Sequence, residues 1–367
     1  LVLGVPTFLM GGTLPAAARA ITAKTDTGRR RLAILYGSNT MGAVMGVSLA
    51  TFFMLEIFGA RHTLWLACLV NGLIGLAARS MSRSNPDEES QDAAIPHSIS
   101  PDVNVAPAAT TPSFVFCAAG IAGFTFMLME LVWYRMLGPL LGGTTYTFGL
   151  ILAVALLGIG LGGVLYALRS ESSRPTPLAF ALTCGLEAFF IALPFALGDR
   201  LAIMAALLRP LGQIGIVGHL LGWSLITSLL VLPAAVVSGY QFPLLIGLLG
   251  RGQKNIGKHV GLTYAWNTSG AIVGSIAGGF LLLPFLTAIG SWKVAIFALV
   301  LVGSLAIAIA FRQEKRIAVL AVPAMVILCS ALLMTATGPT AVWRHTPIGA
   351  GRVDLTRMTR TQIKNWM

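Results

Sequence analysis

The chain has 367 residues, of which 56% are hydrophobic and only 10% are charged, and its mean hydropathy is +0.82. An ordinary soluble domain carries about 25% charged residues, and disordered chains are poor in apolar residues, so the composition excludes both classes. The net charge of +12 lies in short loops between apolar runs, which argues against nucleic acid as a partner. We therefore expect an all-α, polytopic membrane helix bundle whose partner is the lipid bilayer.

Apolar segments predict about ten transmembrane helices along the chain. They are 1–17, 33–58, 63–78, 113–133, 144–168, 177–197, 214–247, 260–287, 292–311 and 317–336. Segment 63–78 is short for a full span, and the long segment 214–247 contains Pro233 and Pro243, which predict a kink or break. The first segment starts without a charged leader, so we expect no signal peptide and a longer chain upstream.

Residues 84–112 interrupt the apolar pattern with five acidic residues and several prolines. This composition predicts a flexible cytoplasmic linker between two membrane halves. Residues 1–83 then form the end of the first half-bundle and residues 113–311 the second, followed by an extra helix at 312–336 and a tail at 337–367.

Basic residues predict the orientation. Under strict alternation of the segments, fifteen Lys and Arg residues fall on one side and five on the other, so the basic side is cytoplasmic. Alternation places the tail outside, although it contains five further basic residues. Either the tail lies outside despite its charge or the segment 317–336 does not cross the membrane, and the sequence leaves both open.

An internal repeat is the most informative pattern. One constant shift in residue number, called here the repeat offset, places Tyr36, Asn39 and Thr40 on Tyr264, Asn267 and Thr268 without a gap. Both copies share the pattern Y-x-x-N-T-x-G-A-[VI]-x-G, and they have the same orientation because an even number of predicted spans separates them. We therefore expect a parallel repeat of the major facilitator type, six helices in each half, with about three helices missing upstream.

Several small residues recur at helical spacing and predict close helix packing. They are Gly42, Gly46, Gly158, Gly162, Gly270, Gly274 and Gly278. The four cysteines Cys68, Cys117, Cys184 and Cys329 each lie singly in an apolar run, which favours buried small side chains over disulfides or zinc ligands.

Ionisable residues inside predicted spans are candidates for function, because a mid-bilayer carboxylate costs about 2.5–3.5 kcal/mol and should face a cavity or a partner. Glu130 is either in an interfacial ion pair with Arg135 or part of a substrate or proton site. For Glu187 a structural and a functional role are equally open, and for His219 a hydrogen-bonded interfacial histidine is favoured.

Asn39 and Asn267 occupy equivalent places in the two copies of the repeat. An Asn there either hydrogen-bonds between helices or caps a broken helix, and the repeat favours a structural role. The sequence contains no hydrolase, kinase or zinc-protease motif, so it predicts no catalytic residue, no metal and no cofactor in this chain.

The run from Glu130 through Trp133, Arg135 and Tyr146 to Phe148, followed by the glycine-rich stretch 157–163, resembles the membrane region of bacterial fused major-facilitator and spermidine-synthase-like proteins. The similarity covers about residues 1–336. It departs from that family at Met129, where a Tyr is frequent, and it lacks the Asp that major facilitators often pair with the Arg after the glycine-rich helix.

The resemblance implies a multi-pass protein of the bacterial inner membrane and adds Tyr146 to the candidate functional residues. It also implies a polyamine or other small-molecule substrate and an aminopropyltransferase domain downstream, to which the tail would lead. The expected function is a membrane module that anchors such a domain and transports for it; the alternatives are a stand-alone secondary transporter and a scaffold that does not transport.

Overall fold

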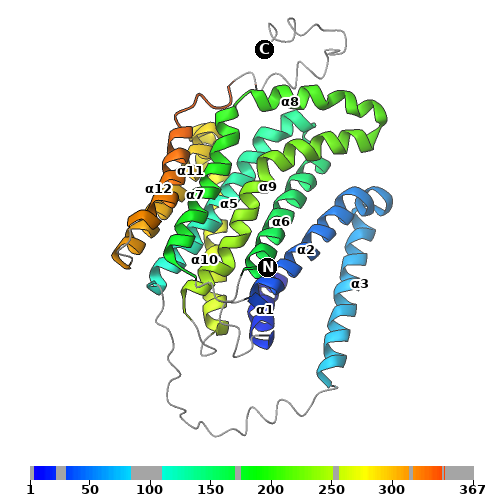
Figure 1. The fold of residues 1–367 in the computed structure, drawn as a ribbon. Helices are drawn as coiled ribbons and strands as arrows, with labels where there is room; N and C mark the ends of the chain where they lie inside the picture. The colour runs from blue at the N-terminus through cyan, green and yellow to red at the C-terminus, as the bar shows by residue number, and fades with distance from the viewer. Residues whose placement is uncertain are drawn as a thin grey trace, which may run out of the picture.

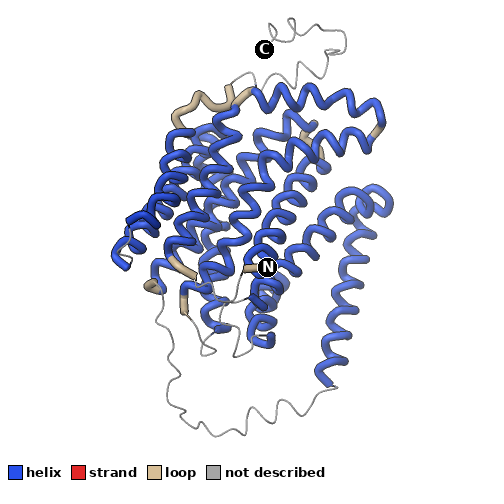
Figure 2. The backbone as a smooth tube through the Cα atoms, in the orientation of Figure 1, coloured by secondary structure: helices blue, strands red, loops and turns tan. Residues whose placement is uncertain are grey.

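The computed structural model describes residues 4–21, 30–83, 110–169, 175–250, 256–313, 317–340 and 343. Figures 1 and 2 show a bundle of helices, and no strand occurs within these ranges. The predicted all-helical class is thus confirmed. The proposed linker lies outside the described residues except at its last three positions, as do residues 341–342 and 344–367 of the tail.

The helices follow one another with short connections. They are α1 Gly4–Ile21, α2 Arg30–Leu49, α3 Leu55–Arg83, α5 Pro112–Leu141, α6 Thr145–Ala167, α7 Pro177–Leu197, α8 Arg200–Leu208, α9 Ile216–Leu248, α10 Ile256–Ala277, α11 Leu283–Gln313 and α12 Ile317–Leu333. Two π-helical turns, η1 Ala50–Met54 and η3 Gly278–Leu282, follow α2 and α10, and a 3-10 helix, η2 Arg209–Ile214, follows α8.

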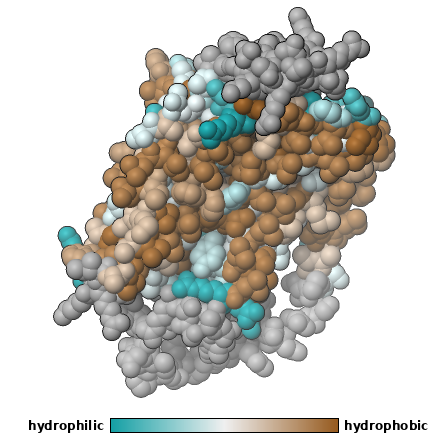
Figure 3. Space-filling view, turned by 45° about the horizontal axis from the view of Figure 1, so that its top comes forward, coloured by the Kyte–Doolittle hydropathy of each residue, from teal (hydrophilic) through white to brown (hydrophobic). Residues whose placement is uncertain are grey.

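Six helical stretches among the described residues are long and apolar enough to cross a membrane, and two shorter apolar helices accompany them. Large apolar side chains are exposed around the bundle, including Phe8, Trp65, Phe280 and Phe311. Figure 3 shows these hydrophobic residues over the flank and hydrophilic ones toward the ends. Such a surface suits lipid rather than water, so the chain is a membrane-spanning helical bundle.

Two of the six stretches contain a sharp reversal of the chain. Gly59 in α3 has φ 69° and ψ 171°, and Thr287 in α11 has φ 61° and ψ 177°. In Figure 1, α2 and α3 run in opposite directions on either side of the first bend. The sequence analysis divided these regions into separate segments, and the short segment 63–78 is in fact part of a helix that continues to Arg83.

Both bends follow a π-helical turn, and the two copies coincide in sequence position. The first residues of η1 and η3, Ala50 and Gly278, are related by the repeat offset, and so are the bends at Gly59 and Thr287. A π-turn inserts one extra residue into the helix and shifts the following side chains around its axis. The same irregularity thus occurs at equivalent positions of the two sequence copies.

The predicted break in segment 214–247 is wrong. Helix α9 is continuous from Ile216 to Leu248, with Pro233 and Pro243 inside it. Helices in a membrane tolerate proline where neighbouring helices pack around the freed backbone groups, and α9 packs along α6 and α7. The sequence analysis also missed α8 and η2, which fill the connection between α7 and α9.

The helices pack in a few extensive pairs. α5 packs along α10, α6 along both α9 and α2, and α7 along α11 and α12. The largest core contains Trp133, Phe195 and Trp292, which are at most 1% exposed. Of the four cysteines only Cys184 is buried; the prediction for the other three is wrong, because they lie on outward faces of their helices.

The segment after α12 is fastened to the end of the bundle where α8 lies, called here the α8 end (Figure 1). The Asp199 carboxylate accepts hydrogen bonds from the Thr340 amide at 3.0 Å, the Thr340 hydroxyl and the Trp343 amide at 3.2 Å. The buried Trp343 indole donates to the Met136 carbonyl at 2.9 Å. Trp343 therefore lies at the end opposite to the one where α2 and α10 begin, called here the basic end.

Candidate functional site

A buried carboxylate and amide pair lies in the middle of the second half. Glu187 is the central residue of α7, Gln241 lies on α9, and each is 1% exposed. The Gln241 Nε2 donates to Glu187 Oε2 at 2.7 Å, and Glu187 also forms a side-chain hydrogen bond with Ser238. A carboxylate at this depth is stabilised here by polar side chains of one neighbouring helix.

A cavity of about 110 Å³, called here the central cavity, lies beside this pair. Its lining comes from α2, α5, α6, α9 and α10, so residues from both predicted halves meet at it. The lining residues that enter the arguments below are Tyr36, Phe126, Ser238, Gln241, Phe242, Asn267 and Ala271.

Aromatic side chains close the cavity on the side of the basic end. The Tyr36 ring is stacked on Phe242 with centroids 4.8 Å apart and planes at 26°, and Tyr264 meets Phe242 edge-on at 6.2 Å. Buried apolar residues surround them. We call this set the closure cluster: Leu14, Ala18, Leu32, Phe242, Ile246 and Val260, with Tyr36 and Tyr264 packed against them.

The closure cluster is built from equivalent positions of the two sequence copies. The repeat offset relates each member on α1 or α2 to a member on α9 or α10. The pairs are Leu14 with Phe242, Ala18 with Ile246, Leu32 with Val260, and Tyr36 with Tyr264. The repeat-related helices thus contact one another near the basic end.

Glycines allow the helices around the cavity to approach closely. A Cβ at Gly158 or Gly162 would meet α9, and one at Gly270 or Gly274 would meet the α5 backbone. At Gly278 it would lie 2.9 Å from a Leu131 methyl group. Gly42 and Gly46 have no other described atom within 4 Å of such a Cβ, so they do not mediate packing within the described chain.

The two repeat asparagines differ in environment. Asn267 borders the central cavity and donates from Nδ2 to the Ala119 carbonyl at 3.1 Å, which joins α10 to α5. Asn39 is exposed on α2 and has no hydrogen bond to another described residue. The interhelical bond expected for both residues is therefore present in one copy.

Glu130 and Arg135 lie apart from the central cavity. Glu130 is half-buried on α5, and Arg135 is exposed beside a separate cavity of about 870 Å³ at the α8 end. No ion pair or hydrogen bond joins them in the described part of the chain. The ion-pair interpretation of Glu130 is thus not realised, because Arg135 is five residues further along α5 and lies on a different side of the helix.

Tyr146 and His219 also lie at the α8 end. The Tyr146 ring is stacked against Phe52 with centroids 5.9 Å apart, and its hydroxyl is hydrogen-bonded to Glu56, so it connects the two halves. His219 is exposed and lies 5.8 Å from the Trp223 ring. No hydrogen bond from its ring to another described residue is present, so the favoured interpretation of a hydrogen-bonded histidine is not realised.

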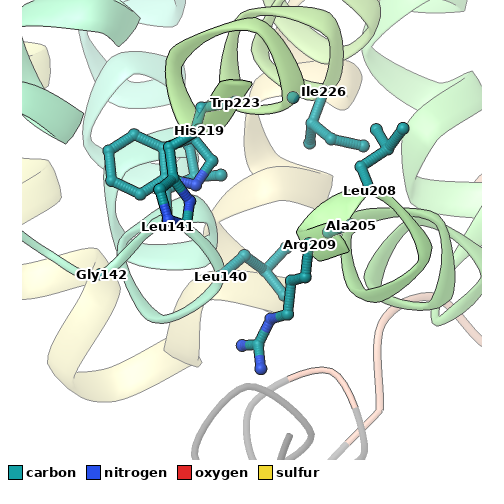
Figure 4. Close-up of a pocket in the computed structure, with 10 residues that line it drawn as sticks. Leu140, Leu141, Gly142, Ala205, Leu208, Arg209, His219, Trp223 and Ile226 are labelled. Carbon is teal, nitrogen blue, oxygen red and sulfur yellow. The ribbon is translucent and has the colours of Figure 1, made fainter. Parts of the chain in front are cut away.

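His219 and Trp223 line one wall of a cavity of about 360 Å³ with Arg209 on the other side (Figure 4). Burial lowers the pKa of the partly buried Arg209 guanidinium from its ordinary value. Leu140, Leu141 and Ile226 form an apolar lining between these polar groups. The cavity does not reach Glu187.

The sequence analysis missed Gln241, Ser238 and Asp199 as residues with defined polar partners. Gln241 is the only Gln within the long apolar segment 214–247, and this isolation was a usable signal. Nothing in the sequence pairs Asp199 with the distant Thr340 and Trp343.

Comparisons with protein-family models, with curated proteins and with solved structures give no match to this chain.

Proposed function

We propose that the chain is the membrane module of a secondary transporter of the major facilitator class, with two repeat-related halves that alternate around the central cavity. The observation that carries this proposal is the closure cluster, in which equivalent residues of the two sequence copies seal one side of a polar cavity. A carrier needs such a contact between its halves, because one access route must be closed while the other is open.

The bends at Gly59 and Thr287 give independent support. If each is a membrane turn, the two long helical stretches contribute two spans each, and α1 and α12 raise the total to the ten that the hydropathy predicts. In this proposal the module lies in a bacterial inner membrane. Its basic end, with Arg30, Lys258 and Arg312, then faces the cytoplasm.

The pairing of helices extends the proposal. α2 packs along the glycine-rich α6, where Gly160 and Gly163 face Met41 and Tyr36. The positions of α10 that correspond to this face, including Ala265 and Ser269, are exposed. A two-halved module places a helix similar to α6 against them, which agrees with the helices expected upstream.

A cysteine accessibility experiment tests alternating access. Ala271→Cys places a thiol at the central cavity in a variant without the four native cysteines. The full-length protein is labelled in right-side-out and in inverted vesicles with a maleimide that cannot cross membranes. A carrier exposes the thiol to both sides in turn, so labelling is expected in both preparations. Labelling from one side only, or from neither, contradicts the proposal and favours a scaffold.

A second proposal concerns the company of this module. The run Glu130–Phe148 resembles the membrane region of spermidine-synthase-like fusion proteins, so we propose an aminopropyltransferase domain in the same gene and a polyamine as solute. The complete coding sequence tests the first point. Uptake of radiolabelled putrescine by vesicles containing the full-length protein tests the second, and uptake no greater than in empty vesicles contradicts it.

A further inference from the structure

Gln241 has a buried oxygen whose hydrogen-bonding capacity is unused. Its Nε2 is committed to Glu187, while its Oε1 is buried and has no hydrogen-bond partner. The residue is 1% exposed and lines the central cavity. A buried acceptor without a partner is costly, and in a native structure it requires an explanation such as a ligand.

The surrounding groups offer more acceptors than donors. Glu187 contributes two carboxylate oxygens, Gln241 an amide oxygen and Ser238 a hydroxyl oxygen, whereas the available donors are one amide group and one hydroxyl. The packed helices α6, α7 and α9 contain no Lys or Arg that could neutralise Glu187. A buried carboxylate without a basic partner calls for a cation from elsewhere.

The size of the space limits what this cation can be. The central cavity measures about 110 Å³, whereas each water in the liquid occupies about 30 Å³, so the space suits a small cation with one or two waters. An extended polyamine does not fit in it. The aromatic rings of Tyr36, Phe126 and Phe242 along its wall also favour a positive charge.

We propose that a compact monovalent cation, of the size of Na⁺ or NH₄⁺, binds at the central cavity between Gln241 Oε1, the Ser238 hydroxyl and the Glu187 carboxylate. Hard cations take oxygen ligands of these three kinds, and an ammonium ion donates hydrogen bonds to the same atoms. The purpose of the site, coupling transport to a cation gradient, rests on the proposed function. The binding itself does not.

Thermal unfolding of the purified full-length protein in lipid nanodiscs tests the binding. NaCl or NH₄Cl replaces choline chloride at constant ionic strength, since choline is too bulky for the site. We expect the unfolding midpoint to rise in a saturable manner, by about 4 °C at a hundredfold excess over Kd. In Glu187→Gln this rise should be lost. The matched control Glu130→Gln changes the other intramembrane glutamate, which lies outside the cavity, and should keep the rise.

Equilibrium binding of radioactive Na⁺ provides a second measurement that does not depend on unfolding, with NH₄⁺ as competitor. Competition by both ions supports the site, and Gln241→Met should weaken Na⁺ binding about tenfold or more, as expected for a lost oxygen ligand. Equal responses of Glu187→Gln and wild type, an equal effect of choline, or no binding of either ion overturns the inference. Bound Na⁺ together with one-sided labelling of Ala271→Cys overturns the transport proposal alone.

Discussion

Gly59 and Thr287 have nearly the same backbone conformation, with positive φ and extended ψ, at equivalent positions of the two sequence copies. At Gly59 this conformation carries no side-chain penalty. At Thr287 a β-branched residue holds it, and Thr287 is the only described residue other than glycine with positive φ. Conformations of this kind cost non-glycine residues about 1–3 kcal/mol.

Thr287→Gly should therefore stabilise the protein. We expect a gain of about 1 kcal/mol, because the relief of backbone strain exceeds the entropy that glycine adds to the unfolded chain. Thermal unfolding in detergent measures the change, with Gly59→Ala as the converse variant that introduces the strain. The explanation is wrong if Thr287→Gly lowers the midpoint.

Gly46 and Gly274 allow a comparison of equivalent glycines in different surroundings. A Cβ at Gly274 would collide with the Phe124 backbone, whereas one at Gly46 meets no other described atom within 4 Å. Gly274→Ala should destabilise by about 1–3 kcal/mol through overpacking. Gly46→Ala should be neutral or stabilise by up to about 1 kcal/mol through higher helix propensity.

The midpoints of these two single variants, measured side by side, check this prediction. Equal destabilisation by both contradicts it and indicates that the face of α2 bearing Gly46 is packed against chain that the structure does not describe.

The sequence was sufficient for the helical membrane class because burial in lipid requires long apolar runs, and these are visible one residue at a time. It was insufficient for α9, where Pro233 and Pro243 predicted a break that packing against α6 and α7 prevents. Local propensity competes with tertiary contacts there, and the contacts prevail.

The candidate site could be predicted only in part. Glu187 stands out because an acidic residue in an apolar run is rare, but its partner Gln241 is 54 residues away on another helix, as is common for interhelical polar pairs. The pairing of Glu130 with Arg135 failed for the opposite reason. Proximity in sequence suggested a contact that the helix geometry does not provide.

Asp199 fastens the segment after α12 to the α8 end, so Asp199→Asn should destabilise the protein. It removes the charge from three hydrogen bonds, those to the amide and hydroxyl of Thr340 and to the amide of Trp343. We expect a loss of about 1.5–3 kcal/mol, the range for hydrogen bonds to charged groups.

Thermal unfolding measures this loss, and two threonines of the same segment supply matched variants. Thr340→Ala should reproduce part of the effect, since its hydroxyl donates to Asp199, while Thr335→Ala removes only an exposed hydroxyl that donates to the Leu332 carbonyl within its own turn. Indistinguishable midpoints for the two threonine variants rule out the fastening role of Asp199.

Phe242 lies between Tyr36 and Tyr264, and its removal should open the closure cluster. Loss of a buried Phe side chain costs about 3–5 kcal/mol, part of which falls on the closed conformation. Since about 1.4 kcal/mol changes an equilibrium tenfold, Phe242→Ala should raise maleimide labelling of Ala271→Cys from the basic end by about tenfold or more. Phe297→Ala on α11 is the control, because that ring is 59% exposed on the outer surface. If both variants raise labelling equally, the change reflects general loosening of the bundle, and the closure cluster does not act as a barrier.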